Sequence, residues 1–403
     1  MAKSLFIMPQ EIRIDGLEGR LGAFNYLEDK TTDKEVIHSL YCRIPERILP
    51  QPNICFLNGL NPVLCTKATC ESEFYVDCLK LFKDADIFVS WSNRPLKAFE
   101  AMRLRLCSKE SIFDDNKVYL DICTLLHSIK AFSNPDLIVL GNLLKTAKFA
   151  GFNGKINRHD QKLKLDALDF LTKKAFELSK QLCSFMLRPI KVVKESINKA
   201  IFEKKALVTV DRKGKLNLII PLKLEGCLVK ALCLKNDEHL FITTLDLRDG
   251  LLIAPYQVLT PQRQKMLNIN LEYRLETIYK ALNDLSSFED LSELSLEEEF
   301  LSKLNDYDKK LYNTISMRGF DVAPILQTSA FFKRWMLLCR GDNYRYSLID
   351  TELSYYQKIS SLQLESQVKS YISEVENLQS LIDENNEDDL NLACALAQYL
   401  NSF

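Results

Sequence analysis

The most distinctive stretch of this 403-residue chain is Leu49-Pro50-Gln51-Pro52, followed shortly by Leu57-Asn58-Gly59-Leu60-Asn61-Pro62. Asparagine and glycine are the residues that tight turns need, so the second run predicts a turned connection. The stretch comes soon after Tyr41-Cys42-Arg43, at the end of a strand predicted over 36–43. It therefore predicts a tightly turned segment behind an early strand.

Strand-like and helix-like patterns alternate over the first part of the chain, up to about residue 190, which is typical of an α/β layer. Strands are predicted over Leu5–Met8, Gly22–Leu27, 36–43 and Ile87–Trp91, and helices over Phe74–Phe82, Leu96–Leu106 and Leu165–Leu187. The last helix is the clearest, because apolar residues recur along it at steps of three and four and form one face. Pro189 is expected to end it, since proline cannot continue a helix.

The chain changes character after residue 205. Leu207–Val210, a turn at Gly214 and Leu216–Leu222 predict a β-hairpin, and 227–234 and 239–247 predict further strands. From Pro261 onward the pattern is mostly helical. An apolar stripe near the end favours a helix packed in an intramolecular bundle over a coiled-coil seam; it consists of Leu364, Val368, Tyr371, Val375, Leu378 and Ile382. We therefore expect three domains, over 1–190, 191–300 and 301–403.

Composition excludes several classes of function. The net charge is −1, so any binding of nucleic acid must rest on a local basic face rather than on the whole molecule. The twelve cysteines show no CxxC pattern, and the twelve glycines form no phosphate-binding loop. Without a signal peptide or a long apolar run, a reduced, cytoplasmic protein with no membrane partner is expected.

Three further segments accompany the stretch at 49–62. They are Ser92-Asn93-Arg94, the run Leu-Gly-Asn-Leu-Leu-Lys-Thr-Ala at 140–147, and tail runs at 310–313, 340–344 and 370–371. In this order they resemble bacterial exonuclease I, a nuclease that digests single-stranded DNA from the 3′ end. The resemblance implies an α/β RNase H-like exonuclease domain, then a small β-rich barrel-like domain, then a C-terminal α-helical domain.

The resemblance also shows where catalytic groups should lie. Nucleases of this class hold two divalent metals with four carboxylates and use a histidine as general base. An Asp-x-Glu pair on the first strand corresponds to Met8 and Gln10, and the second aspartate corresponds to Leu96. Mg²⁺ is a hard cation that requires oxygen ligands, which methionine and leucine do not provide. These positions predict a degenerate metal site.

The last catalytic motif of the family, a histidine five residues before an aspartate, can be aligned in two ways. One alignment keeps Asp169 as the sole retained family acid and places Lys164 at the histidine position. The other keeps His159 as the base, and Lys164 then replaces the aspartate. In either case the set of catalytic groups is incomplete.

We therefore hypothesise a catalytically inactive exonuclease-I-like protein that needs no cofactor. It would be a binding or scaffolding subunit for single-stranded DNA, or for a protein partner such as single-stranded-DNA-binding protein. The alternative is an active 3′→5′ single-stranded DNA exonuclease whose Mg²⁺ is held by shifted acids, namely Glu11, Asp15, Glu100, Asp166 or Asp169. A third possibility is a structural member of a larger assembly that never meets DNA.

Basic residues cluster near the degenerate site. The candidates for nucleic-acid binding are Leu57, Asn58, Gly59, Arg94, Lys145, Lys148, Lys155, Arg158, Lys162 and Lys164. Lysine and arginine neutralise phosphates, and by the resemblance Leu57, Asn58 and Gly59 contact a strand end. The alternative interpretation is a solvated lysine-rich surface beside a turn that needs asparagine and glycine. Phe149 and Phe152 are expected to be core residues or loop anchors.

Overall fold

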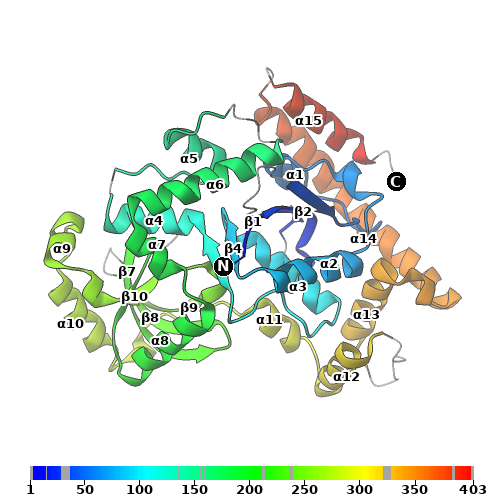
Figure 1. Cartoon of the computed structure of the whole chain (residues 1–403). Helices are drawn as coiled ribbons and strands as arrows, with labels where there is room; N and C mark the ends of the chain where they lie inside the picture. Colours follow the sequence, from blue (N-terminus) through cyan, green and yellow to red (C-terminus); the bar gives the residue numbers. More distant parts are fainter. Residues whose placement is uncertain are drawn as a thin grey trace.

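The first sheet of the computed structural model is a mixed sheet of five strands (Figure 1). Its order is β3 (Ile37–Tyr41), β2 (Arg20–Glu28), β1 (Ser4–Arg13), β4 (Ile87–Ser90) and β5 (Val118–Asp121). β1 and β3 pair antiparallel with β2, whereas β1 with β4 and β4 with β5 pair parallel. The predicted α/β layer is confirmed, and β5 is a strand that the sequence pattern did not predict.

The structure describes residues 3–14, 16–28, 37–134, 136–154, 157, 159–210, 214–235, 239–320, 328–383 and 386–400. Residue 36 of the predicted strand over 36–43 lies outside these ranges. Within them, no helix is both long enough and apolar enough to cross a membrane.

Alternate side chains of β1 enter two different apolar clusters. Leu5 and Ile7 pack with α2 (Glu71–Asp84) and α3 (Lys97–Arg105) on one face of the sheet. Phe6 and Met8 pack with α4 (Ile122–Phe132) and α6 (Gln161–Leu178) on the other face. Because side chains alternate along a strand, Gln10 follows Met8 toward the face that α6 covers.

The second sheet is antiparallel and has the order β10 (Ile253–Pro255), β6 (Leu207–Val210), β7 (Leu216–Glu225), β8 (Leu228–Leu234) and β9 (Leu240–Asp246). The predicted hairpin of β6 and β7 is confirmed, although residues 211–213 of its turn lie outside the described ranges. Helix α8 (Ile190–Phe202) packs on one face and α10 (Leu271–Ala281) on the other. Among described residues no pairing joins β10 to β9, so the sheet is open rather than closed like a barrel.

The remaining described α-helices are α1 (Pro52–Asn58), α5 (Leu143–Phe149), α7 (Lys180–Met186), α9 (Pro261–Leu267), α11 (Leu296–Ser302), α12 (Asp306–Arg318), α13 (Ala330–Asn343), α14 (Asp350–Asn377) and α15 (Glu387–Tyr399). The predicted single helix over Leu165–Leu187 is wrong, because Ser179 has φ −156° and ψ 79° and separates α6 from α7. The apolar stripe along α14 packs inside the molecule against α1 and α15, as predicted.

Three arginines and three carboxylates connect the first sheet to the C-terminal helices. The group consists of Arg20, Arg47, Arg105, Glu18, Glu71 and Asp342. Arg20 of β2 contacts Glu71 of α2 at 3.0 Å and Asp342 of α13 at 3.1 Å. Arg47 contacts the same aspartate at 2.8 Å. Since these four side chains are 2–3% exposed, their charges are stabilised by each other rather than by water.

Candidate functional site

Amide groups form a hydrogen-bonded chain at the end of β1, where the resemblance places metal ligands. Gln10 Nε2 donates to the Asn58 carbonyl at 2.7 Å, and Asn25 Nδ2 of β2 donates to Gln10 Oε1 at 2.9 Å. The Ser39 hydroxyl of β3 donates in turn to Asn25 Oδ1 at 2.6 Å. Gln10 is 3% exposed. Its oxygen and its nitrogen are therefore both used to hold strands and loop together.

Lys164 reaches the same place from the first turn of α6. Its Nζ donates to the Asn58 carbonyl at 2.8 Å, so the ammonium group and the Gln10 amide share one acceptor oxygen. Asn58 Nδ2 donates back to the Glu11 carbonyl at 2.8 Å. Gly59 ends α1 with φ +67°, a conformation that favours glycine, which explains the turn in the motif. A positive charge thus lies beside Gln10.

Met8 and Leu96 complete the four family positions. Met8 packs against the apolar cluster under α4 and α6, and Leu96 is fully buried in the cluster on the opposite face of the sheet. A thioether, an aliphatic chain and an ammonium group are not ligands for Mg²⁺, and the Gln10 oxygen already accepts a hydrogen bond. The residues at these positions do not fit a two-metal centre.

Asp169 does not come to the end of β1. Five residues separate it from Lys164, which turns an α-helix by roughly 140° beyond one full turn. Its carboxylate instead contacts Lys173 on its own helix at 2.6 Å. The alignment that keeps Asp169 as the retained acid therefore stays a prediction that no described contact of Asp169 near Gln10 supports. The geometry favours the alternative, in which His159 keeps the histidine position and Lys164 replaces the aspartate.

His159 is held by the C-terminal helix. Its Nε2 lies 2.6 Å from Asp389 Oδ1 in the first turn of α15, and its ring meets Phe56 of α1 edge-on. Asn157 Nδ2 donates to Asp388 Oδ2, also at 2.6 Å. No sequence signal points to these two acids, because about 230 residues separate them from the loop that they contact. The histidine that the alternative alignment assigns as general base is thus part of a contact between the loop and α15.

The shifted acids proposed for an active enzyme do not gather at one point. Glu11 lies where the β1–β2 ladder is irregular on both sides of it and faces a cleft that Arg94 also lines. Glu100 contacts Arg103, and Asp15 lies outside the described residues. Within the described ranges, Asp166 included, no group of three or more His, Cys, Asp or Glu residues is placed to hold a metal.

Burial raises the pKa of Glu11 to about 7, although the nearby Arg94 charge opposes the shift. The carboxyl group therefore binds its proton more tightly in the folded protein than at its ordinary pKa of 4.5 in the unfolded chain. The stability that Glu11 contributes is fully present below pH 4.5, the ordinary pKa of the group, and is lost as the pH rises through about 7. We expect Glu11→Gln to raise the free energy of unfolding by about 2 kcal/mol at alkaline pH, with little effect under acidic conditions.

Urea unfolding of both proteins on either side of neutral pH measures this difference. The control is Glu293→Gln, which changes another acid in the same cleft. Glu100→Gln would not serve, because it also breaks the ion pair between Glu100 and Arg103. An equal effect of Glu11→Gln at both pH values would contradict the raised pKa.

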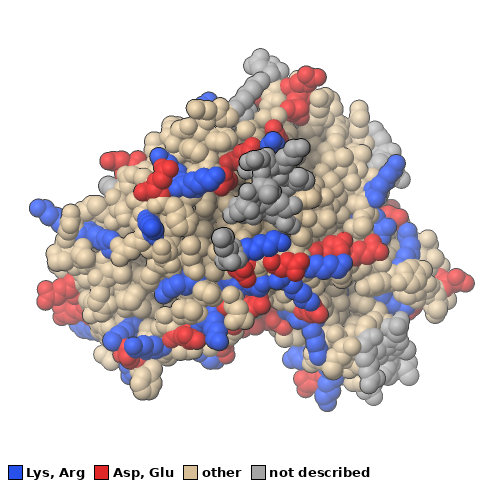
Figure 2. Space-filling view, viewed as in Figure 1, with Lys and Arg blue, Asp and Glu red and all other residues tan. Residues whose placement is uncertain are grey.

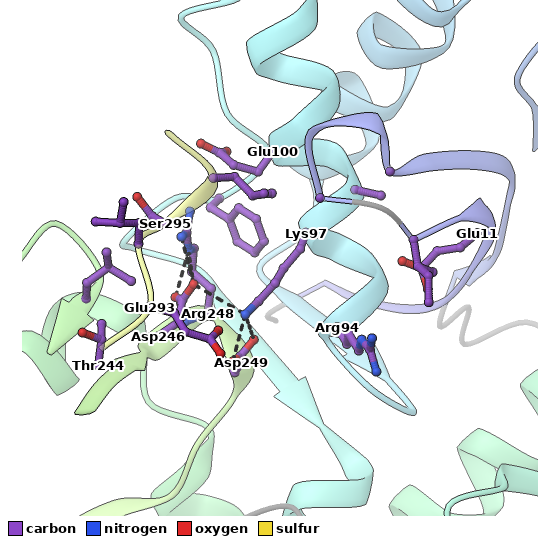
Figure 3. A pocket seen from close by; sticks show the side chains of 18 residues that line it. Glu11, Arg94, Lys97, Glu100, Thr244, Asp246, Arg248, Asp249, Glu293 and Ser295 are labelled. Carbon is purple, nitrogen blue, oxygen red and sulfur yellow. Dashed lines mark hydrogen bonds and ion pairs between the residues drawn. The ribbon is translucent and has the colours of Figure 1, made fainter. Parts of the chain in front are cut away.

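The same cleft, of about 320 Å³, separates the first sheet from the second (Figure 3). Lys97, which directly follows Leu96, points across it and contacts Asp249 at 3.0 Å. Arg248 contacts Asp246 at 2.9 Å. Because Lys97 and Arg248 are already paired with Asp249 and Asp246, these two cations offer little charge for phosphates, and the exposed Arg94 is the other basic residue lining the cleft.

The lysines of α5 and α6 are more accessible. Lys145, Lys148 and Lys162 are exposed, as is Arg94, whereas Lys155 and Arg158 lie outside the described residues. Phe149 is 65% exposed at the end of α5, so the expectation that it is a core residue or a loop anchor is wrong, while Phe152 packs against Phe170 as expected. Leu57 is 56% exposed at the end of α1.

Charge on the visible face of the molecule is mixed. Figure 2 shows basic and acidic side chains interleaved across this face, without a broad area of one sign. Charges of opposite sign that close together largely cancel beyond a Debye length of about 8–10 Å. A local group of exposed lysines therefore has to provide any attraction to phosphates.

The sequence matches no protein-family model and no curated protein. Solved structures of exonuclease I do match. The E. coli exonuclease I–single-stranded DNA complex in its zinc-bound form has a TM-score of 0.73 at 14% identity, over 100% of this chain and 99% of that one. The E. coli enzyme with a dA16 oligonucleotide gives 0.72 at 13% identity over both full lengths. The chain has the exonuclease I fold.

A structure described as SSB/exonuclease I with the inhibitor CFAM has a TM-score of 0.75 at 13% identity, over 100% of this chain and 99% of that one. The exonuclease I fold therefore extends over the whole chain, as the four collinear segments predicted. An identity this low shows the fold and leaves the chemistry to the residues themselves. On that fold, the amides of Gln10 and Asn25 form a hydrogen-bonded chain near the end of β1, and Lys164 of α6 contacts the same Asn58 carbonyl as Gln10.

Proposed function

We propose that this protein is a non-catalytic member of the exonuclease I fold that binds single-stranded DNA, or a protein of DNA metabolism, without digesting the strand. One observation supports this above all others: the Lys164 ammonium group and the Gln10 amide share the Asn58 carbonyl. Two-metal hydrolysis needs converging carboxylates at such a point. An ammonium group would repel the cations instead, so the fold is kept for binding.

Binding is supported by the solved neighbours and by the surface. Exonuclease I is described in complex with oligonucleotides and with SSB. In this chain Lys145 lies three residues before Lys148 and four before Phe149 on α5, so it is a neighbour of both on the helix surface. Lysines neutralise phosphates, and an exposed aromatic ring can stack on a base.

The experiment combines digestion and binding. A 5′-labelled oligonucleotide is incubated with the protein and Mg²⁺ or Mn²⁺, and its length is followed. We expect no shortening, but an affinity that falls as salt rises. Shortening that follows the protein through further purification would show a live nuclease and overturn the proposal. Glu11→Gln, Glu100→Gln, Asp166→Asn and Asp169→Ala would then identify the acid that supports it.

Replacing Lys145 and Lys148 together by glutamine is expected to reduce the slope of log affinity against log salt by about 1.4, since each of the two phosphates that is no longer neutralised removes roughly 0.7. Lys173→Gln with Lys174→Gln is the matched control, because these exposed lysines already contact Asp169 and Glu177. Equal reductions in both pairs would indicate a general charge effect. No strand affinity in any protein would exclude nucleic acid as the ligand and leave a protein partner.

A further inference from the structure

Helix α15 covers the segment that the sequence motif marks. In Figure 1 this C-terminal helix lies beside α1, at the opposite end of the chain's sequence. Leu392, Leu396 and Tyr399 of α15 share one apolar cluster with Phe56 and Leu60. The helix is thus anchored by its apolar face on α1 and on the turn that follows, next to the exposed Leu57.

The first turn of α15 is acidic and points at the loop before α6. It carries Glu387, Asp388 and Asp389 in succession. Asp388 accepts from Asn157 at 2.6 Å, and Asp389 lies 2.6 Å from the His159 ring nitrogen. Because an ionised carboxylate can only accept hydrogen bonds, Nε2 of His159 carries the proton in this contact.

The two contacts differ in their surroundings. Asp389 is fully buried and also accepts from the Asp383 backbone and from Asn386 Nδ2, so it has a part in folding the helix start. Asp388 is exposed. It contacts Asn386 through its backbone N–H, which donates to Asn386 Oδ1, so this contact does not depend on the Asp388 side chain. The Asp388 side chain can therefore be changed with little effect on packing.

Carboxylates and phosphates accept hydrogen bonds from the same donors. An amide N–H and an imidazole N–H are groups that bind phosphate oxygens in nucleic-acid complexes, and charge assists both contacts. Here the protein's own anions use these donors, a short distance along the chain from Lys162 and Lys164. A strand approaching this loop would meet the exposed Asp388 carboxylate and would find the Asn157 and His159 donors already in use.

We propose that the acidic first turn of α15 is an internal competitor for nucleic acid: Asp388 and Asp389 take the donors of Asn157 and His159 and so weaken strand binding at the loop before α6. The proposal rests on the proposed strand-binding function. It adds that the affinity of the intact protein is lower than its surface could provide, and that it rises when these carboxylates are removed.

The test compares single-charge variants at one helix terminus. Asp388→Ala and Glu387→Ala both remove one exposed negative charge from the first turn of α15, but only Asp388 contacts Asn157. We expect Asp388→Ala to raise the affinity for an unstructured oligonucleotide about threefold at low ionic strength, with the gain fading as salt screens it. Glu387→Ala should raise the affinity by less than half as much.

A second variant examines the buried contact. Asp389→Asn keeps the shape of the side chain while removing its charge, and combined with Asp388→Ala it should raise the affinity about tenfold. Thermal unfolding is measured first; if the double variant does not fold, Asp388→Ala against Glu387→Ala decides alone. Equal gains in the two single variants, or none, overturn the proposal.

The results also distinguish a failure of the internal competitor from a failure of the proposed strand-binding function. A wild-type protein that binds a strand, with variants that bind no better, keeps the strand-binding function and removes the internal competitor. No strand affinity in the wild type together with a gain in Asp388→Ala supports the competitor in a stronger form. No affinity in any variant removes both.

Discussion

Replacing Asp342 by alanine is expected to lower the free energy of unfolding by about 3–5 kcal/mol. Asp342 is the shared partner of Arg20 and Arg47, and Tyr356 also donates to it at 2.9 Å. Without its carboxylate, two buried guanidinium groups would keep their charges, Arg47 losing its main counter-ion and Arg20 keeping only Glu71 in contact. Water is a poor replacement, because the Asp342 side chain is only 2% exposed where it meets the arginines.

Urea unfolding of the wild type and the variant measures the loss. Tyr356→Phe is the matched control, since it removes one hydrogen bond to the same carboxylate and should cost only about 1 kcal/mol. A similar small loss for both variants would mean that the arginines find other partners.

The same group of charges should make the protein less stable in acid. Burial alone would raise the pKa of Glu71, but the charges of Arg105 and Arg20 outweigh it and hold that pKa below its usual value. Its contribution is therefore present at neutral pH and lost as the pH falls through the lowered pKa.

Returning three acids to the end of β1 is expected to create a cation site where the wild type has none among its described residues. The variant carries Met8→Asp, Gln10→Glu and Lys164→Asp. Met8 and Gln10 lie two residues apart on one strand, and Lys164 meets Gln10 at the Asn58 carbonyl, so the three new carboxylates would converge. Carboxylates held this way bind Mn²⁺ or Mg²⁺, with a dissociation constant of about 1 mM for an unoptimised site.

Calorimetry with Mn²⁺ and the shift of the unfolding temperature on adding it measure the new site. The three acids repel one another, so the variant should be less stable than wild type without metal and should regain stability with it. The control replaces Lys162, an exposed lysine in the same turn of α6, by aspartate in place of Lys164. Equal metal binding in the control and the variant would show that Lys164 does not face β1.

The spacing of apolar residues and the positions of turn-forming residues were enough to predict β1, β2, β4, the hairpin of β6 and β7, and the inward face of α14. Each of these depends on contacts between residues close in sequence or on a regular apolar repeat. The break at Ser179 was not predictable in this way, because the apolar repeat continues through it. The position of Phe149 was also missed, since an aromatic residue on a short helix is consistent with either burial or exposure until the neighbouring helix is placed.

Residue types alone establish which chemical groups are missing: Met8, Gln10 and Leu96 carry no carboxylate for magnesium, wherever the fold places them. The sequence leaves the two alignments of the last motif open, and only the three-dimensional arrangement says which side chains lie near Gln10. It brings Lys164, not Asp169, to the end of β1, and it places Asp388 and Asp389 against Asn157 and His159. Both outcomes depend on helix rotation and on contacts between residues more than 100 positions apart, and a linear pattern carries no record of either.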